Sequence, residues 1–374
     1  MNFFPIKLKG DRIIWILIIM LALISVLSVY SSTYQQTLKE GNILGVIVRH
    51  ICFLFVGFVI IYVLHQIPVS QYKKLAPIAL IFAIFLLALV FVDSSAANAR
   101  APRWALGGRL QPSDIARVVM VIYLAKALSE GFKNKEEFII KILLPVGIVC
   151  LMIINGHTSA VIMIGFASLL LILMSTSNRK YLTITFLCVA VAGILYFTFD
   201  EYLGRAETVE GRFGTFFGAK ENKTDDLQAA TAKLAIASGG IIGKGPGNSI
   251  YRETLSEAHN DYIYAIIVEE YGFVGGLFVM SIYMILFFRI ILAIRKCNKI
   301  FPKLLLSGLI LLIVVQAFIH IGVSVGGIPV TGQNLPFISK GGTSIITTSI
   351  AFGIILSVSR AIEESLEIND SEKV

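Results

Sequence analysis

The sequence predicts an all-α polytopic membrane protein with about ten transmembrane helices and a large outer loop between the seventh and the eighth. Hydrophobic residues make up 56% of the 374 residues and charged residues only 15%, whereas about a quarter of a soluble domain is charged. The apolar residues also gather in runs long enough to cross a bilayer. Both observations argue against a soluble enzyme, a disordered chain and a fibrous protein.

The first apolar run follows three basic residues and lacks a small-residue cleavage site, which indicates a retained span rather than a signal peptide. We treat residues 1–374 as a single integral membrane domain that contains a large extracytoplasmic loop at 200–260. The runs that predict helices are Ile13–Tyr30, Ile43–Leu64, Leu75–Val92, Ile115–Leu128, Phe138–Ile154, Ser159–Met174, Tyr181–Phe199, Tyr262–Leu286, Leu304–Val325 and Ser344–Val358.

The distribution of basic residues predicts the orientation. Once the long 200–260 loop is set aside, most lysines and arginines lie in the short loops on the side of the two termini. Short loops decide topology, so we expect both termini in the cytoplasm. The net charge of +8 could suggest nucleic acid. Basic residues between apolar runs suit lipid or phosphate headgroups better, so we expect no nucleic acid partner.

The outer loop before the fourth run carries three arginines, against the charge rule, and Arg103 is one of them. Arg117 follows inside the run itself. Such cations fit an anionic ligand, such as a lipid phosphate or pyrophosphate. The alternative is a set of interfacial arginines that only snorkel. Pro112, followed by Ser113 and Asp114, predicts a helix start in which Ser113 or Asp114 supplies the cap.

Five glycines surround Lys244 in the segment 239–249 of the long loop, after an alanine-rich stretch, Leu227–Ser238, that predicts a helix. Backbone N–H groups of such a segment could cradle a phosphate. The segment is not a Walker motif, because the Gly-Lys-Ser/Thr ending is absent and Pro246 removes a donor. A plain flexible turn is the alternative.

Glu257, His259 and Asp261 cluster where the eighth run begins. A carboxylate at the membrane border can serve as a general base toward a lipid-linked substrate. The alternative is that Asn260 or Asp261 only caps the helix. Glu269, inside the run, is expected to be a structural support together with its neighbour Glu270, one of them paired with a cation or protonated.

The last outer loop, Gly326–Ser344, contains paired glycines and two prolines. Irregular backbone at membrane depth persists where it lines a cavity or is buried in protein, so we expect one of these two environments for this loop. The five histidines and four cysteines show no metal-ligand spacing, and we expect no protein metal site built from them.

These segments together resemble the SEDS family of cell-wall proteins (shape, elongation, division and sporulation), which includes FtsW and RodA. The wording of the long-loop motif is more similar to the FtsW division branch. The motifs that carry the resemblance are Arg103-Trp104 with Gln111–Ser113, the segment Ser238–Ser249, the segment Glu257–Ala265, the segment Glu269–Gly272, and Pro329–Gly332 with Pro336–Ser344.

The resemblance implies a peptidoglycan glycosyltransferase that polymerises lipid II at the outer face of the membrane, in cell division at the septum. It implies that Asp261 deprotonates the acceptor hydroxyl, and that a divalent cation (Mg²⁺ or Mn²⁺) could help to hold the pyrophosphate. It also implies a class B penicillin-binding protein as partner, alongside other division proteins. The expected substrate-binding residues are Arg103, Arg117, Arg212, Lys244, Glu257, His259 and Ser344.

The chain departs from the family pattern at several positions. Arg117 replaces the usual lysine, Lys340 stands where tyrosine or a small residue is common, and Ile154–Ser159 lacks the usual acid. His320 and Asn260 replace the usual asparagine and threonine. Two other functions stay open on sequence alone. A lipid II flippase would need polar groups through the full membrane depth, and a non-catalytic septal scaffold would tolerate the loss of the carboxylate.

Overall fold

The computed structural model describes residues 9–40, 43–92, 104–105, 110–154, 156–175, 180–188, 223–255 and 258–371. These residues are helical apart from turns and a single β-bridge between Ala105 and Leu110. The all-α prediction is confirmed. The elements are α1 (Arg12–Glu40), α2 (Ile43–Gln66), α3 (Val69–Val92), α5 (Pro112–Glu130), α6 (Lys135–Phe138) with a π-helical turn (Ile139–Leu143), α7 (Leu144–Ile154), α8 (Thr158–Ser175), α11 (Lys223–Gly239), a 3₁₀ turn (Tyr251–Glu253), α12 (Ile263–Lys296), α13 (Ile300–Ser324) and α14 (Gly342–Ser371).

Eight stretches of helix within the described residues are long and apolar enough to cross a membrane, so the chain is a multi-pass membrane protein. Helix α5 is not among them, because its 19 residues include four charged ones. Much of the predicted seventh span, Tyr181–Phe199, lies outside the described residues, as does the first part of the 200–260 loop. The total of about ten spans therefore stays a prediction.

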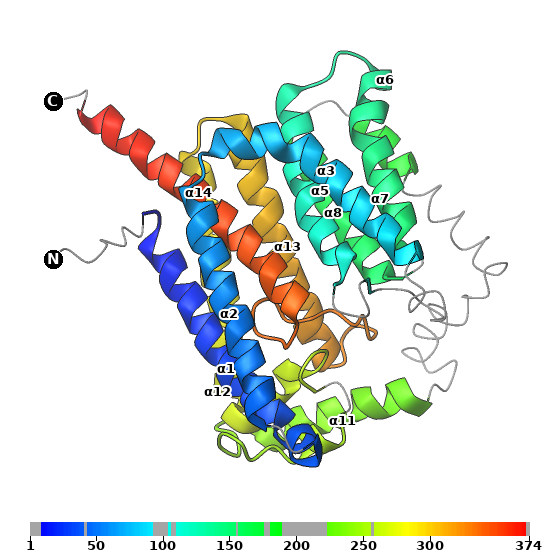
Figure 1. Ribbon diagram of the computed structural model, residues 1–374, viewed down its shortest axis with the longest axis vertical. Helices are drawn as coiled ribbons and strands as arrows, with labels where there is room; N and C mark the ends of the chain where they lie inside the picture. The colour runs from blue at the N-terminus through cyan, green and yellow to red at the C-terminus, as the bar shows by residue number, and fades with distance from the viewer. Residues whose placement is uncertain are drawn as a thin grey trace.

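Helices α13 and α14 form the centre of the bundle (Figure 1). In their most apolar stretches 72% and 78% of the residues are buried, against 22% in α2. The outer helices instead expose large apolar side chains, such as Phe55 of α2 and Ile81 of α3, each 69% exposed. Apolar side chains on this surface suit the hydrocarbon of a bilayer, which explains why hydropathy does not distinguish the inner helices from the outer ones.

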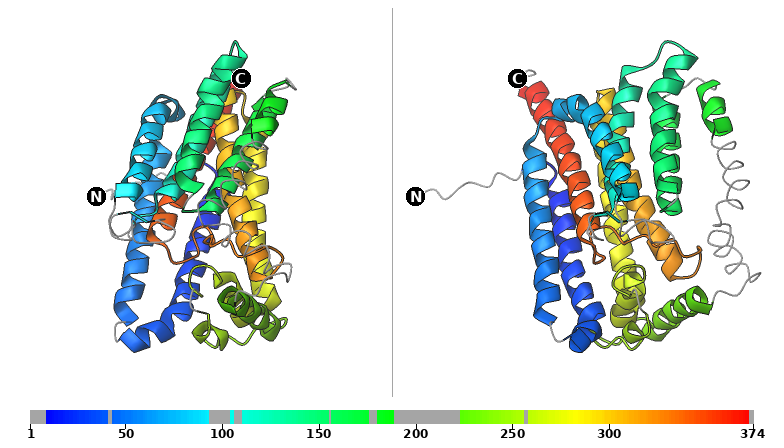
Figure 2. Two further views of the ribbon diagram at one scale, coloured as in Figure 1. Left: turned by 90° about the vertical axis from the view of Figure 1, so that its right-hand side faces the viewer. Right: turned by 45° about the vertical axis from the view of Figure 1, so that its right-hand side comes forward.

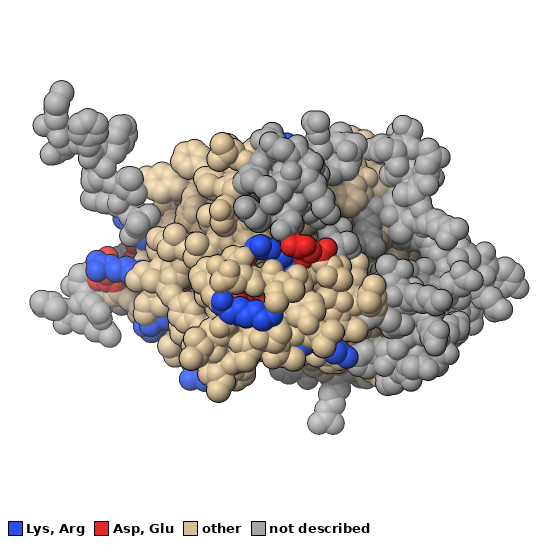
Figure 3. Space-filling view, turned by 90° about the horizontal axis from the view of Figure 1, so that it is seen from below, with Lys and Arg blue, Asp and Glu red and all other residues tan. Residues whose placement is uncertain are grey.

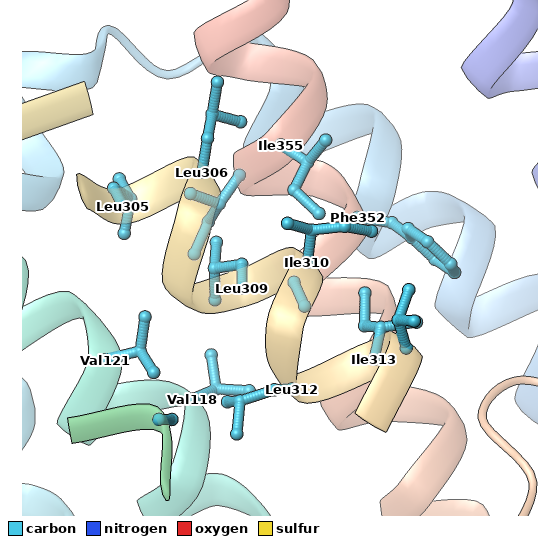
Figure 4. Packing of buried hydrophobic residues seen from close by; sticks show 14 of the residues in the cluster. Val118, Val121, Leu305, Leu306, Leu309, Ile310, Leu312, Ile313, Phe352 and Ile355 are labelled. Atoms are coloured by element: carbon cyan, nitrogen blue, oxygen red, sulfur yellow. The ribbon is translucent and has the colours of Figure 1, made fainter. Parts of the chain in front are cut away.

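The core is built around α13 (Figure 4). On one side its leucines, including Leu309, face Val118 and Val121 of α5, and on the other α13 lies against Phe352 and Ile355 of α14. All five side chains are buried. Because Arg117 directly precedes Val118, this packing fixes the height and direction at which the start of α5 presents its polar residues.

Helices α2 and α14 approach each other closely at two glycines. A Cβ atom on Gly57 of α2 would lie 2.5 Å from the Ser349 hydroxyl of α14. A Cβ atom on Gly353 of α14 would lie 2.7 Å from Leu64 of α2. Small residues at helix contacts are the usual means of close packing in membranes. The start of α14, which borders the site, is therefore held tightly against α2.

The start of α1 and the far end of α14 lie on the same side of the bundle. The Lys9 ammonium pairs with Glu364 at 3.1 Å, and the Asp11 backbone N–H donates to the Ser359 hydroxyl at 3.1 Å. At the opposite end α11 runs across the bundle instead of along it (Figure 1, Figure 2). Seen from that end, the described surface carries basic and acidic side chains only in small groups (Figure 3), which does not resemble a broad nucleic-acid-binding face.

Two predictions about helix starts are wrong. The residue that precedes α5 is Gln111, with Pro112 at the first helical position, so neither Ser113 nor Asp114 is the cap. The residue at the cap of α12 is Tyr262, so the alternative in which Asn260 or Asp261 occupies the cap position fails as well. These polar side chains are instead available for contacts between segments, which the next subsection describes.

Candidate active site

Two loops that are far apart in the sequence are joined beside Asp261. The Lys340 backbone N–H donates to the His259 carbonyl at 3.0 Å, and the Ser339 hydroxyl donates to the Asn260 carbonyl at 2.9 Å. The turn before α12 and the last outer loop are thus one unit of structure. This pairing places the side chain of Lys340 in the same cavity as that of Asp261.

The cavity has a volume of about 350 Å³, which lies within the range of small-molecule sites. It lies at the end of the bundle where α5 begins, α13 ends and α12 starts. Its walls combine carboxylates, cations, amides and one indole. The lining residues are Trp104, Gln111, Asp114, Arg117, His157, Asn260, Asp261, Gln316, Gly332, Gln333, Asn334, Lys340 and Gly341.

Arg117 is held in the cavity wall by side chains from four segments, one of which is Met163 of α8, whose sulfur lies 3.2 Å from the guanidinium. Its guanidinium pairs with Asp114 one turn earlier on α5. It also donates to the amide oxygen of Gln333 at 2.9 Å and, over a longer 3.4 Å, to that of Gln316 on α13. Arginine and aspartate are both nearly fully buried. A buried guanidinium held in a fixed plane is suited to bind a phosphate through several N–H donors.

A second, much smaller pocket of about 20 Å³ adjoins the cavity and shares Asp114, Arg117 and Gln316 with it. Ser344, a predicted substrate-binding residue, lines this pocket together with Thr347 and apolar residues of α5, α13 and α14. Ser344 therefore lies beside the arginine but not on the wall of the main cavity. Its role in substrate binding stays a prediction.

Lys244 is bound elsewhere. Its ammonium pairs with the fully buried Glu269 carboxylate at 2.8 Å and donates to the Ser238 hydroxyl at 2.8 Å. The backbone N–H groups of Lys244 and Gly245 donate to the carbonyls of Glu269 and Glu270. The donors that we expected to be open to a phosphate are thus used to bind α12. The loop of residues 239–249 is therefore neither a phosphate cradle nor a plain flexible turn. We call it the clasp, because its backbone and Lys244 bind α12.

The clasp fits a kink in α12 at Gly272, whose φ of 70° lies in the left-handed region. The expectation that Glu269 pairs with a cation inside the membrane protein is confirmed. Glu270 accepts a hydrogen bond from Ser31 of α1, and Arg252 lies close enough to act on it electrostatically. Both acids are structural supports of the clasp.

The other predicted residues divide into two groups. His259 contributes its carbonyl to the pairing of the loops, and it does not line the cavity. Burial, together with the nearby Lys340 charge, lowers the pKa of its imidazole to about 4, so the ring is neutral at pH 7. Arg103, Arg212 and Glu257 lie outside the described residues.

Most residues of the cavity lining were not predicted as site residues, and His157, Gln333 and Lys340 are among them. The signal for Lys340 was a cation beside two glycines in a loop of irregular backbone. The signal for His157 was a polar residue between two apolar runs, in the segment 154–159 that lacks an acid. Gln333 had no signal beyond its place in the last outer loop, because an amide gains its role only from its neighbours.

The described residues contain no group of three histidines, cysteines, aspartates or glutamates that could hold a metal ion. The cavity lining includes two carboxylates, and Asp114 is already engaged by Arg117. A metal cage made of protein ligands alone does not fit here. The lining does fit a cation that a bound substrate would help to hold, because Mg²⁺ commonly takes one or two carboxylates plus substrate phosphates, and Asp261 would be the carboxylate that holds it.

Comparison with known proteins identifies the family. Residues 11–364 match the family model of the cell cycle proteins FtsW, RodA and SpoVE. The chain belongs to this family. Among its relatives, the peptidoglycan glycosyltransferase MrdB of Escherichia coli K12 is 29% identical over 355 residues, which make up 91% of this chain and 92% of that protein. The probable peptidoglycan glycosyltransferase FtsW of Geobacter metallireducens is 30% identical over 362 residues, covering 94% and 95% of the two chains.

Solved structures share the fold of this SEDS protein. A chain of a peptidoglycan synthase complex, described as coordinating polymerization and crosslinking, superposes with a TM-score of 0.76 at 21% identity, over 94% of this chain and 98% of that chain. RodA of Thermus thermophilus superposes with a TM-score of 0.68 at 21% identity, over 95% and 98% of the two chains. The identities to MrdB and to FtsW differ by one percentage point, 29% against 30%, so membership of the division branch stays a prediction.

Proposed function

We propose that this protein is a peptidoglycan glycosyltransferase that polymerises lipid II into glycan strands. One observation carries the proposal: Asp261, Arg117 and Lys340, from three distant segments, line a single cavity. A carboxylate and two cations in one small cavity match the needs of a transfer in which an alcohol attacks and a diphosphate leaves. The names of relatives on both sides of the family support the same chemistry.

In the proposed reaction, the hydroxyl oxygen of the acceptor sugar attacks the anomeric carbon of the donor sugar. A new C–O bond forms while the bond from that carbon to the diphosphate oxygen breaks, and the polyprenyl diphosphate leaves with the electron pair. Asp261 accepts the proton of the attacking hydroxyl. A placed general base accelerates such a step by roughly 10²–10⁴-fold.

The leaving diphosphate gains negative charge as the bond breaks, and Arg117 and Lys340 are placed to stabilise it. Asp114 and Gln333 fix the plane of the guanidinium, which lowers the cost of ordering it when the substrate binds. Trp104 adds an indole face to the same cavity, and an aromatic surface of this kind suits a sugar ring.

A divalent cation, Mg²⁺ or Mn²⁺, belongs to the proposal, and Asp261 is the residue that would help to hold it. It would supply additional positive charge to the leaving group. The residues of the chain would hold it through the Asp261 carboxylate, with the remaining ligands from substrate and water.

We place the cavity on the outer face of the bacterial cytoplasmic membrane, with both termini in the cytoplasm. The basic short loops support this orientation, as does the contact between the start of α1 and the end of α14, which puts these two ends of the chain on one side. The structural likeness to a chain of a peptidoglycan synthase complex supports a crosslinking partner. We propose a class B penicillin-binding protein, together with other division proteins at the septum.

The proposal is tested by extension of labelled lipid II in detergent or vesicles, with the cognate transpeptidase present. Asp261→Ala and Asp261→Asn should each lower the rate by roughly 10²-fold or more. Both variants should keep the wild-type melting temperature, because the carboxylate borders a cavity and not the core. If Asp261→Asn polymerised lipid II at the wild-type rate, the assignment of Asp261 as the base would be refuted.

The two alternative functions predict different results for the same protein and its Asp261→Asn variant. A flippase would move labelled lipid II between leaflets without extending it, and a septal scaffold would support division with Asp261→Asn. The position of the polar residues favours the enzyme. Glu269 and Glu270, the acids inside the predicted eighth span, are engaged by Lys244 and by Ser31 and do not line the cavity.

A further inference from the structure

His157 occupies an unusual place in the cavity wall. It lies just before α8, is only 5% exposed, and both of its ring nitrogens have close polar neighbours. Its Nδ1 lies 3.0 Å from the amide nitrogen of Gln111 and 3.1 Å from the hydroxyl of Ser113. Its Nε2 lies 2.7 Å from the amide nitrogen of Gln333. A buried imidazole with this many partners is fixed in orientation, and its proton can be located from them.

The amide of Gln333 has its orientation set on both sides. Its oxygen accepts a hydrogen bond from Arg117, whose guanidinium can only donate. Its nitrogen donates to the hydroxyl of Ser159 at 2.8 Å, and that hydroxyl in turn donates to the Thr331 carbonyl at 2.9 Å. The NH₂ group of Gln333 therefore faces His157.

The position of the imidazole proton follows. Nε2 of His157 has to accept from Gln333, so the single proton of the neutral ring is on Nδ1, where the Ser113 hydroxyl accepts it. Gln111 can turn its amide oxygen toward the same proton, since amide orientation follows the network. The result is a chain of hydrogen bonds with one direction, from Arg117 through Gln333 to His157 and on to Ser113.

We infer that His157 is a positioning residue, which holds Arg117 in its substrate-binding orientation through Gln333 and does so only as the neutral Nδ1–H tautomer. A proton on Nε2 would set an N–H group against the Gln333 NH₂ group. To relieve this, Gln333 would turn over and present its NH₂ group to the guanidinium, and Arg117 would lose its closest amide acceptor. Acid pH should therefore weaken the grip on the diphosphate.

The inference rests on the proposed function only in that Arg117 binds a diphosphate. Other groups near the ring also titrate or carry charge, and they have to be separated from it. His320 is linked to the network because its Nδ1 lies 2.8 Å from the Gln333 carbonyl. Protonation of a cavity carboxylate would remove repulsion and strengthen anion binding, the opposite sign. The groups concerned are Asp114 and Arg117 on α5, His320 on α13, and Asp261 and Lys340 on the two joined loops.

The test measures the dissociation constant of undecaprenyl diphosphate for the full-length protein in nanodiscs between pH 8 and pH 5. For the wild type we expect binding to weaken by about tenfold or more toward pH 5, the effect of losing a hydrogen bond to a charged group. In His157→Gln the amide can still accept from Gln333 but does not titrate, so binding should resemble the wild type at pH 8 and fall toward pH 5 only by the smaller amount that protonation of the diphosphate itself causes. His157→Phe has no acceptor and should bind weakly at every pH.

A matched control is His65→Gln on α2, a buried histidine outside the cavity that contacts the Tyr62 carbonyl. It should keep the wild-type pH slope. The inference is overturned if His157→Gln retains that slope, or if His157→Phe binds as tightly as the wild type at pH 8 while folding normally. If the pH dependence of binding depends on His157 but the protein never extends lipid II, the proposed function is refuted and the role of His157 stands. If the protein extends lipid II but binding does not depend on His157 in this way, the role of His157 is refuted and the proposed function stands.

Discussion

Lys244 and Lys340 are both lysines beside glycines in outer loops, yet their surroundings differ completely. Lys244 lies in a clasp: its ammonium meets the buried Glu269 carboxylate at 2.8 Å. Lys340 lies in a loop that is pinned to His259 by its backbone, and its side chain lines the cavity that holds Asp261. The comparison teaches that a glycine-flanked cation is not in itself a phosphate site. What differs is the surroundings: Lys244 is held by a buried carboxylate away from the cavity, whereas Lys340 lines the cavity that also contains Asp261 and Arg117.

The glycines of the clasp explain this difference. A Cβ atom on Gly243 would lie 2.2 Å from the Glu270 carbonyl oxygen, and one on Gly272 would lie 2.2 Å from the Ile241 carbonyl oxygen. The bare backbones let the loop approach the kink of α12. Close approach was correctly expected of these glycines, but the group approached is a helix and not a ligand.

The largest expected effect comes from filling that contact. Gly243→Ala should prevent stable folding or cost at least about 3 kcal/mol, because the methyl group collides with backbone and φ is +91°. Gly240→Ala is the matched control, since its φ is also positive (+56°) but a Cβ there meets nothing within 4 Å. Thermal melting in detergent measures both. Equal losses in the two variants would show that backbone strain, and not the clasp, is responsible.

The next effect is on folding stability, to which we expect Lys244 to contribute more than Lys340. Lys244→Met leaves the Glu269 carboxylate buried without its partner, which should cost about 3–5 kcal/mol in free energy of unfolding. The double variant Lys244→Met/Glu269→Met should recover much of that loss. Denaturant or thermal unfolding provides the measurement. An unchanged melting temperature in Lys244→Met would contradict the assignment of this lysine to the clasp.

Lys340→Met should weaken substrate binding and leave stability nearly unchanged, and the free energy involved should be smaller. We expect KM for lipid II to rise by about tenfold, the loss of a charge-assisted contact of roughly 1.5 kcal/mol, while the melting temperature stays within a degree or two of wild type. Lys340→Arg should restore most of the affinity. Steady-state extension of labelled lipid II gives KM, and a KM equal to that of the wild type would remove Lys340 from the site.

The last effect appears only at low pH and concerns His259, whose pKa is lowered to about 4 by burial and by the Lys340 charge. Between pH 6.5, the ordinary histidine value, and pH 4, the unfolded chain binds a proton that the folded protein does not, so stability should fall as pH falls through this window. His259→Gln should reduce the fall and leave activity at pH 7 unchanged. Melting temperatures measured at pH 7 and pH 4.5 test both statements, and an unchanged pH slope would contradict them.

Two residues of the site could be predicted from the sequence, because a charge at or inside an apolar run stands out without any tertiary contact. Asp261 at a helix border and Arg117 inside a span were singled out as unusual charges, and the structure brings them into one cavity. The broken backbone of the loop Gly326–Ser344 predicted that it either lines a cavity or is buried in protein, and the structure decides for the cavity at Gln333 and Lys340. The occupation of Lys244 was not visible, since its partner lies 25 residues further along the chain.

The sequence by itself determined that the chain is a bundle of membrane helices, because hydropathy and helix length act locally and need no tertiary contact. It also determined which charges were too costly to be accidental. Only the tertiary structure decided what surrounds each of those charges: Glu269 meets Lys244 away from the cavity, whereas Arg117 pairs with Asp114 on the cavity wall. That choice depends on the distance between side chains from different helices, and distances of this kind are set by packing around α13 and α14, not by the order of residues along the chain.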